Sequence, residues 1–237
     1  MKNITIILLF FISTLSFSGD IIKLELDNPS PRAGEKIELS FNIDPLKKEL
    51  ENQLTNGISL YNVKSIFNDY NNGFTKDIVF NSPGKYTVGP FKFEINGTTY
   101  LSDSIIITVL DKLPFEPGLW IRTSEMNGKN YLIIEQYIEN SEKVKKKKNT
   151  TTYTTEKKSE FAKLSREAEE FSVKNSSSNS TNKRADESDY SSKSMSFSFS
   201  KYEIKLEESL EGEFVFEKKH FENLPKRYKI EGVSIKK

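Results

Sequence analysis

Apolar and polar residues alternate with a period of two in several parts of the chain. In residues 37–43 every apolar side chain stands at an odd position, and residues 91–95 follow the same rule. Because successive side chains of a strand point to opposite faces, this period predicts β-strands with one buried face. The opening of the chain is therefore expected to form a sheet-based domain.

Other apolar segments predict the remaining strands of this first domain, at residues 21–26, 58–67, 74–80, 84–88, 98–101 and 105–110. Asn96-Gly97 accepts the positive φ angles of a type I′ turn and predicts a tight hairpin. The residues Asn71-Asn72-Gly73 predict a second turn, and leucines at helical spacing over 46–54 predict a short helix. About seven or eight strands are typical of an immunoglobulin-like β-sandwich.

A second domain is predicted after the proline-rich linker at 113–118. Strands are expected on both sides of Asn127-Gly128, and strand patterning returns at 197–206, 213–216 and 228–235. The predicted fold class is all-β, with two immunoglobulin-like β-sandwich domains. The first spans 19–112, and the second combines 113–140 with 197–237.

Residues 141–196 interrupt this pattern. Five lysines crowd residues 143–148, and serine dominates residues 172–200. Such segments bury too little apolar surface to offset the entropy of the chain. Between them, apolar residues at helical spacing predict an amphipathic helix: Phe161, Leu164, Ala168 and Phe171. We expect 141–196 to be a disordered or helical low-complexity insertion in the second domain.

Three motifs, at residues 34–35, 84–90 and 118–122, together resemble those of the BatD-like family of oxygen-tolerance, or aerotolerance, proteins. The pattern G-x-Y-x-x-G-P at 84–90, with the hairpin and β-branched run after it, resembles the end of the family's first extracytoplasmic domain. Gly34-Glu35 after Pro31 matches an early turn, and residues 118–122 resemble the start of the second domain. The resemblance covers residues 20–125. It implies a membrane-associated periplasmic protein of the bacterial envelope, with von Willebrand factor A-type and MoxR-type proteins as partners.

The first eighteen residues have the features of a signal peptide. Lys2 precedes a nearly continuous apolar stretch, and Ser16 and Ser18 are small residues suited to cleavage before Gly19. Members of the family usually carry a membrane helix after their sandwich domains, but no apolar run after Gly19 is long enough to span a bilayer. We expect an exported protein, periplasmic, or tethered to the inner membrane where the signal stays uncleaved.

The charged and reactive residues favour a protein without catalytic activity. The 237 residues contain 35 basic and 34 acidic side chains, and this balance argues against nucleic acid as a partner. With no cysteine and only His220, the chain lacks a histidine-pair zinc site and a Cys–His nucleophile. His220 is expected at the surface or at a strand edge. We expect no catalytic residue, no cofactor and no metal.

Two groups of residues are candidates for binding. Trp120 is the only tryptophan, and Arg122 shares its strand face, so both are predicted at a partner or interdomain contact, with Arg122 paired to a buried acid. The second group is basic and is predicted either to contact an anionic surface or to form a solvated loop: Lys143, Lys145, Lys146, Lys147 and Lys148.

The predicted function is an exported, non-catalytic protein–protein interaction module of a BatD-like envelope complex, in stress tolerance or envelope assembly. The alternative is a surface adhesin or a protein that binds a polyanion or another envelope ligand.

Overall fold

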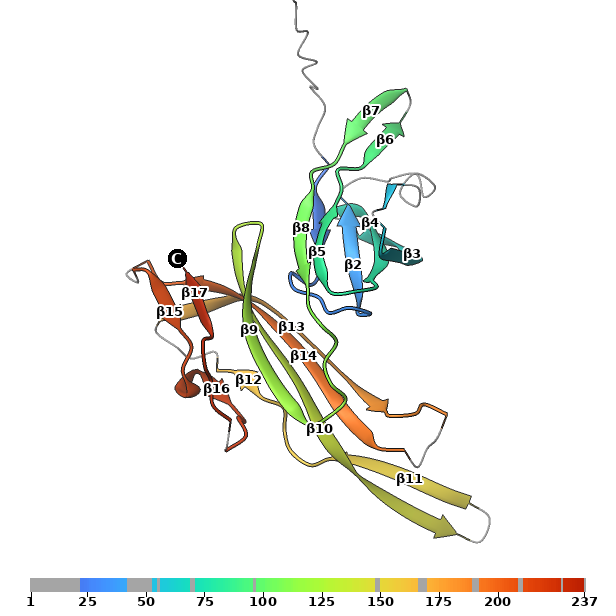
Figure 1. The fold of residues 1–237 in the computed structure, drawn as a ribbon, viewed down its shortest axis with the longest axis vertical. Coiled ribbons are helices and arrows are strands. Elements are labelled where there is room, and N and C mark those ends of the chain that lie inside the picture. Colours follow the sequence, from blue (N-terminus) through green and yellow to red (C-terminus); the bar gives the residue numbers. More distant parts are fainter. Residues whose placement is uncertain are drawn as a thin grey trace, which may run out of the picture. The chain divides into compact units, whose positions relative to one another are not determined.

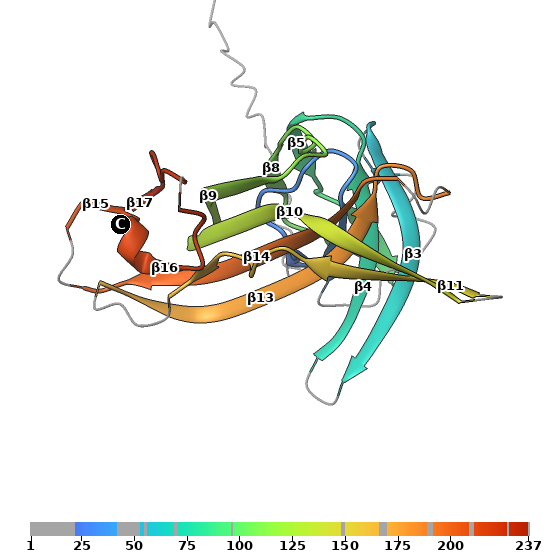
Figure 2. The same cartoon turned by 90° about the horizontal axis from the view of Figure 1, so that it is seen from below.

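The computed structural model describes residues 22–41, 53–54, 56–68, 71–95, 97–147, 150–165, 170–188, 192–208, 211–226 and 228–236. Strands are the dominant secondary structure of the described part and form several antiparallel sheets (Figures 1 and 2). This confirms the all-β class. None of the helices within the described residues has the length and apolar character needed to cross a membrane.

The chain divides into two compact units. The first comprises Met1–Asn28 and Ala33–Val109, and the second comprises Pro29–Arg32 and Leu110–Lys237. This division falls close to the boundary that the sequence predicts at 112. The assignment of Pro29–Arg32 to the second unit has no signal in the sequence.

The strands of the first unit form one sheet of four strands and two separate pairs. The sheet has the order β1-β2-β4-β3, and the pairs are β5–β8 and β6–β7. Their bounds are β1 Leu24–Leu26, β2 Lys36–Phe41, β3 Ile58–Asn68, β4 Asn71–Phe80, β5 Gly84–Val88, β6 Lys92–Ile95, β7 Thr98–Leu101 and β8 Ile105–Val109. All pair antiparallel.

The core of the first unit is built from the apolar faces that the period of two predicts. In β2 the buried residues alternate with more exposed ones, and β8 repeats this pattern. Phe41 on β2 contacts Phe91 and Phe93, each with ring centroids 6.2 Å apart. These aromatic contacts join the four-stranded sheet to the segment around β6.

The strands predicted in the first unit are confirmed, but the turn at Asn71–Gly73 is wrong. These residues begin β4 and pair with residues 66–68, so a propensity for turns is overridden by ladder pairing. Residues 1–21, which include the predicted signal peptide, lie outside the described residues. So do residues 42–52, which include most of the helix predicted over 46–54.

The second unit is built on a five-stranded antiparallel sheet. Its path is β11-β10-β14-β13, and β9 also pairs with β10. The bounds in this unit are β9 Gly118–Met126, β10 Lys129–Lys147, β11 Thr150–Lys157, β12 Lys163–Leu164, β13 Phe171–Arg184, β14 Ser194–Leu206, β15 Glu213–Val215, η1 Lys218–His220, β16 Phe221–Glu222 and β17 Ser234–Lys236. Asn127 and Gly128 have φ angles of 53° and 70° in the two-residue β9–β10 loop, which confirms the predicted hairpin.

The two faces of this sheet have different chemistry. One face is apolar: Leu132 and Ile134 on β10, with Tyr202 and Ile204 on β14, belong to the main core of the unit. The short strands β15, β16 and β17 lie together beside one end of the sheet (Figures 1 and 2), and Phe214, Phe216, Phe221 and Ile235 from this region pack into the same core. The opposite face carries Arg122, Glu135 and Tyr137.

The predicted insertion at 141–196 is wrong over its described residues. Strand β10 continues to Lys147, β11 and β13 are strands, and β14 begins at Ser194. The amphipathic helix predicted from Phe161 to Phe171 is wrong as well, because Leu164 belongs to β12 and Phe171 opens β13. Both residues are buried in the core of the second unit.

The physical reason is that the serines are ordered by a neighbouring strand rather than by their own apolar area. Along β14, serines on one face alternate with Met195, Phe197 and Phe199 on the other, and Ser196, Ser198 and Ser200 are each only 5% exposed. Two of these hydroxyls are hydrogen-bonded to other side chains: Ser196 to Asn140 at 2.7 Å, and Ser200 to Ser178 on β13 at 2.8 Å. Buried polar groups that are paired in this way carry little cost.

We predict that Gly97→Val destabilises the first unit by roughly 1–3 kcal/mol, the usual cost of backbone strain. Gly97 has a φ of +78°, and no atom lies within 4 Å of a Cβ at this position, so the cost comes from the backbone alone. Urea unfolding of the variant measures it. Gly97→Asn is the control, because asparagine tolerates this conformation. Equal stability of the two variants would contradict the turn.

Candidate functional site

Glu135 is a carboxylate in the middle of the longest strand of the second unit. It lies on β10, and the register places it beside Trp120 of β9 and Phe199 of β14. Its side chain is only 2% exposed. A carboxylate buried this far is costly unless it is paired and hydrogen-bonded.

Arg32 supplies the first partner. Its Nε donates to both carboxylate oxygens of Glu135 at 2.9 Å, and its Nη2 donates to Oε2 at 2.7 Å. Its Nη1 donates to the carbonyl oxygen of Asp111 at 2.8 Å. A guanidinium fork on a carboxylate is one of the strongest polar contacts available to side chains.

Arg122 supplies the second partner from the neighbouring strand. Its Nη1 lies 3.2 Å from Oε2 of Glu135, and its Nη2 donates to the carbonyl oxygen of Ser30 at 2.6 Å. The sequence predicts that Arg122 pairs with a buried acid, and Glu135 is that acid. We call Arg32, Arg122 and Glu135 the charged cluster.

The charged cluster fixes the four residues Pro29–Arg32 within the second unit. Two further hydrogen bonds hold this segment: Leu110 N–H to the carbonyl of Pro31 at 2.9 Å, and the Ser124 hydroxyl to the carbonyl of Pro29 at 3.2 Å. The cluster carries two positive charges and one negative charge. Removing the carboxylate would leave two largely buried guanidinium groups without a counter-charge.

An aromatic cluster lies on the same face of the sheet. Its centre is Tyr137, whose ring centroid is 4.8 Å from that of Phe197, 5.8 Å from Phe115 and 6.3 Å from Trp120. The Lys183 ammonium stands 4.3 Å above the Phe197 ring and donates to the Tyr137 hydroxyl at 3.2 Å. Tyr137 is buried, whereas Trp120, Phe115 and Phe197 are half-buried.

Gly118 explains how Trp120 is held. A Cβ built at Gly118 would lie 2.4 Å from Cη2 of the Trp120 ring, so the indole covers this glycine closely. Residues 118 and 120 share a strand face because side chains alternate. Only glycine leaves room for the indole at this distance.

The structure brings together only part of the lysine group predicted from the sequence. Residues 143–147 belong to β10 and pair with β11 over 150–154, and the side chain of Lys145 is exposed. The side chains of Lys143, Lys146 and Lys147, and the whole of Lys148, lie outside the description. The prediction of a contact with an anionic surface therefore stays a prediction.

The prediction of a surface position for His220 is wrong. The residue is 4% exposed, and its ring packs against Phe171, Phe214 and Phe216, with centroids 5.3–6.1 Å apart. Its Nδ1 accepts a hydrogen bond from the backbone N–H of Glu217 at 2.8 Å. These contacts give it a role in fixing η1 to the core. Among the described residues, no group of His, Cys, Asp or Glu has the arrangement of a metal site.

Two residues of the charged cluster have weak or absent signals in the sequence. Glu135 is the only acid in the mostly apolar stretch of residues 131–138, and this position is a usable signal. Arg32 follows Pro31 in what reads as an ordinary turn, so its role depends wholly on tertiary contacts.

Comparison of the chain with protein-family models, with curated proteins and with solved structures finds no match. The resemblance to the BatD-like family therefore rests on the sequence motifs alone.

We predict that Glu135→Gln destabilises the second unit by roughly 3–5 kcal/mol, the usual cost of breaking one side of a buried ion pair. Urea unfolding followed by Trp120 fluorescence measures the change, because this is the only tryptophan. Glu139→Gln is the matched control on the same face of β10. Its partner is Lys158, and both side chains are exposed, so little change is expected. A midpoint equal to that of the control would rule out the charged cluster as a stabilising element.

We predict that Gly118→Ala displaces the Trp120 indole. The added methyl group would overlap the ring, so tryptophan emission should shift to longer wavelength and acrylamide quenching should increase. Gly97→Asn, where a Cβ meets no neighbour, should leave both signals unchanged. Wild-type emission and quenching in Gly118→Ala would show that the indole does not cover residue 118.

Proposed function

We propose that this protein is an exported, non-catalytic interaction module that binds other proteins in the bacterial envelope. The BatD-like motifs in residues 20–125 give the context, which is oxygen or stress tolerance or the assembly of envelope complexes. The first eighteen residues support export to the periplasm, with a tether to the inner membrane where they are retained.

The aromatic cluster is the observation that carries this proposal. Aromatic side chains dominate the binding energy of protein interfaces, and rigid, partly exposed ones lose little entropy on binding. Trp120 is half-buried and lies closely over Gly118, and Tyr137 is fixed by Phe197 and Lys183. The charged cluster lies beside these rings on the same strands, so the face is rigid before any partner arrives.

The chemistry of this face indicates what a partner must supply. Trp120, Phe115 and Phe197 offer apolar ring surface, and Lys183 places one positive charge over the rings of Phe197 and Tyr137. A complementary surface would present an aliphatic or aromatic anchor beside a carboxylate. By resemblance to the BatD-like family, we propose von Willebrand factor A-type proteins and the MoxR system as the source of such a surface.

We further propose that the two units are immunoglobulin-like β-sandwiches. In the first unit, the contacts of Phe41 with Phe91 and Phe93 and the buried face of β8 support two packed layers. In the second unit, support comes from the shared core of the large sheet and the short pairs β12–β16 and β15–β17. We propose no catalytic role for either unit.

A second candidate is binding of a polyanion or another envelope ligand, as in a surface adhesin. The specific observation is the lysine-rich end of β10, where the Lys145 side chain is exposed. Binding of this kind weakens steeply as salt rises, whereas docking to a folded protein through aromatic rings depends less on salt.

The test is co-purification from crosslinked cell envelopes, with the recovered proteins identified by mass spectrometry. We expect von Willebrand factor A-type or MoxR-system proteins with the wild type. Trp120→Ala should reduce their recovery, and the affinity for the isolated partner should fall roughly thirtyfold, as for a typical hot-spot residue. Circular dichroism and urea unfolding establish that the variant is folded.

Val215→Ala is the matched control, because Val215 is an exposed apolar residue of the second unit outside the aromatic cluster. It should bind like the wild type. Equal recovery with Trp120→Ala and Val215→Ala would reject the aromatic cluster as the docking face. Binding that is unchanged by Trp120→Ala but lost at 0.5 M salt would favour the polyanion candidate instead.

A further inference from the structure

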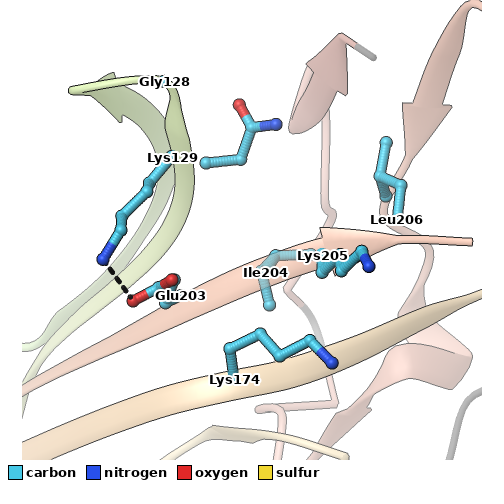
Figure 3. Close-up of a pocket in the computed structure, with 8 residues that line it drawn as sticks. Gly128, Lys129, Lys174, Glu203, Ile204, Lys205 and Leu206 are labelled. Carbon is cyan, nitrogen blue, oxygen red and sulfur yellow. Dashed lines mark hydrogen bonds and ion pairs between the residues drawn. The ribbon is translucent and has the colours of Figure 1, made fainter.

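A hollow of about 290 Å³ lies in the second unit beside the β9–β10 turn. Three lysines and one acid line it, and they come from three strands: Lys129 from β10, Lys174 from β13, and Glu203 and Lys205 from β14 (Figure 3). We call it the lysine hollow. Its residue Lys129 begins β10, at the opposite end of this strand from the lysines of residues 143–147, and no sequence pattern singles the hollow out.

The lysine hollow has more positive charge than its single acid can balance. Lys129 Nζ lies 3.5 Å from Glu203 Oε2, and no ion pair joins Lys174 or Lys205 to any residue that the structure describes. The ladder between β10 and β14 ends at the pair Asn130 and Ile204. Lys129 precedes Asn130 on β10, and Lys205 follows Ile204 on β14. Three ammonium groups and one carboxylate leave a net charge of two.

A β-bulge places the third lysine. The pairing of β13 with β14 shifts register between Val173 and Asn175, so Lys174 is an extra residue without a partner in the ladder. Bulges commonly redirect a side chain near functional sites. In Figure 3 the ammonium ends of Lys174 and Lys205 lie on the same side of the hollow, away from the Lys129–Glu203 pair. A second hollow, of about 550 Å³, adjoins Lys174 along β13.

We propose that the lysine hollow binds a phosphate-type dianion, either free or carried on a larger molecule. A phosphate monoester has a charge between about −1.5 and −2 at pH 7 and three acceptor oxygens, and this matches the excess charge and the ammonium donors of the hollow. A simple carboxylate would neutralise only half of that excess. This proposal does not depend on protein binding through the aromatic cluster.

The experiment is an NMR titration of the full chain with inorganic phosphate and pyrophosphate at constant ionic strength. We expect saturable shifts of the side-chain resonances of Lys129, Lys174 and Lys205. The double variant Lys174→Gln/Lys205→Gln should bind at least tenfold more weakly. The control variant Lys218→Gln/Lys226→Gln removes two exposed lysines outside the hollow and should bind like the wild type.

Two results would overturn the proposal. One is a set of shifts that never saturates, or that affects Lys218 and Lys226 as much as the hollow, since this is the signature of diffuse attraction. The other is saturable binding that the double variant retains in full.

Sedimentation with vesicles distinguishes the two sources of the phosphate group. Co-sedimentation with phosphatidate vesicles that pyrophosphate displaces, and that phosphatidylcholine vesicles do not reproduce, assigns a phosphate on a lipid headgroup. Saturable binding of phosphate in solution without co-sedimentation assigns a free phosphate. Either result supports the dianion site, provided that the double variant loses the binding.

Discussion

The second unit depends on the compensation of one buried carboxylate. Glu135 lies where β10 is covered on both faces, and an isolated charge in such a place costs several kcal/mol. Arg32 and Arg122 meet that cost with a bidentate fork and a second contact at 3.2 Å. Because the three residues come from Pro29–Arg32, β9 and β10, their pairing requires all three segments to be in place together.

The two faces of the large sheet have different roles in the second unit. One face is devoted to the apolar core with Leu132, Ile134 and Phe216. The other face carries the charged cluster and the aromatic cluster, whose rings point away from the core because successive side chains of a strand alternate between faces. Trp120 is the clearest case, since its ring covers Gly118 and meets the edge of the Tyr137 ring.

Exposed charges on the same sheet are not paired in the way that the buried charge of Glu135 is. Where charge is buried, at Glu135, partners surround it closely. At the lysine hollow, the charges of Lys174 and Lys205 are left to solvent, and a bulge brings one of them there. An unpaired charge costs little free energy while water solvates it, and it attracts a ligand of opposite charge. The buried cluster therefore contributes to stability, whereas the exposed lysines are the site of the proposed anion binding.

The sequence by itself determined the features that depend on neighbouring residues. The period of two in β2 and β8 predicted their buried faces, because alternation is a local property of an extended chain. Asn127-Gly128 predicted its hairpin, because positive φ angles select for these residues. The pairing of Arg122 with a buried acid was also predictable, since an arginine on a half-buried strand needs a counter-charge.

Only the tertiary structure decided where the serine-rich segment belongs and where Arg32 acts. The serines of β13 and β14 have too little apolar area to order themselves, and the ladder between the two strands orders them instead. Arg32 reaches Glu135 across a sequence separation of 103 residues. Contacts at such separations leave no periodic trace in the sequence, because their geometry is fixed only after the sheet has formed.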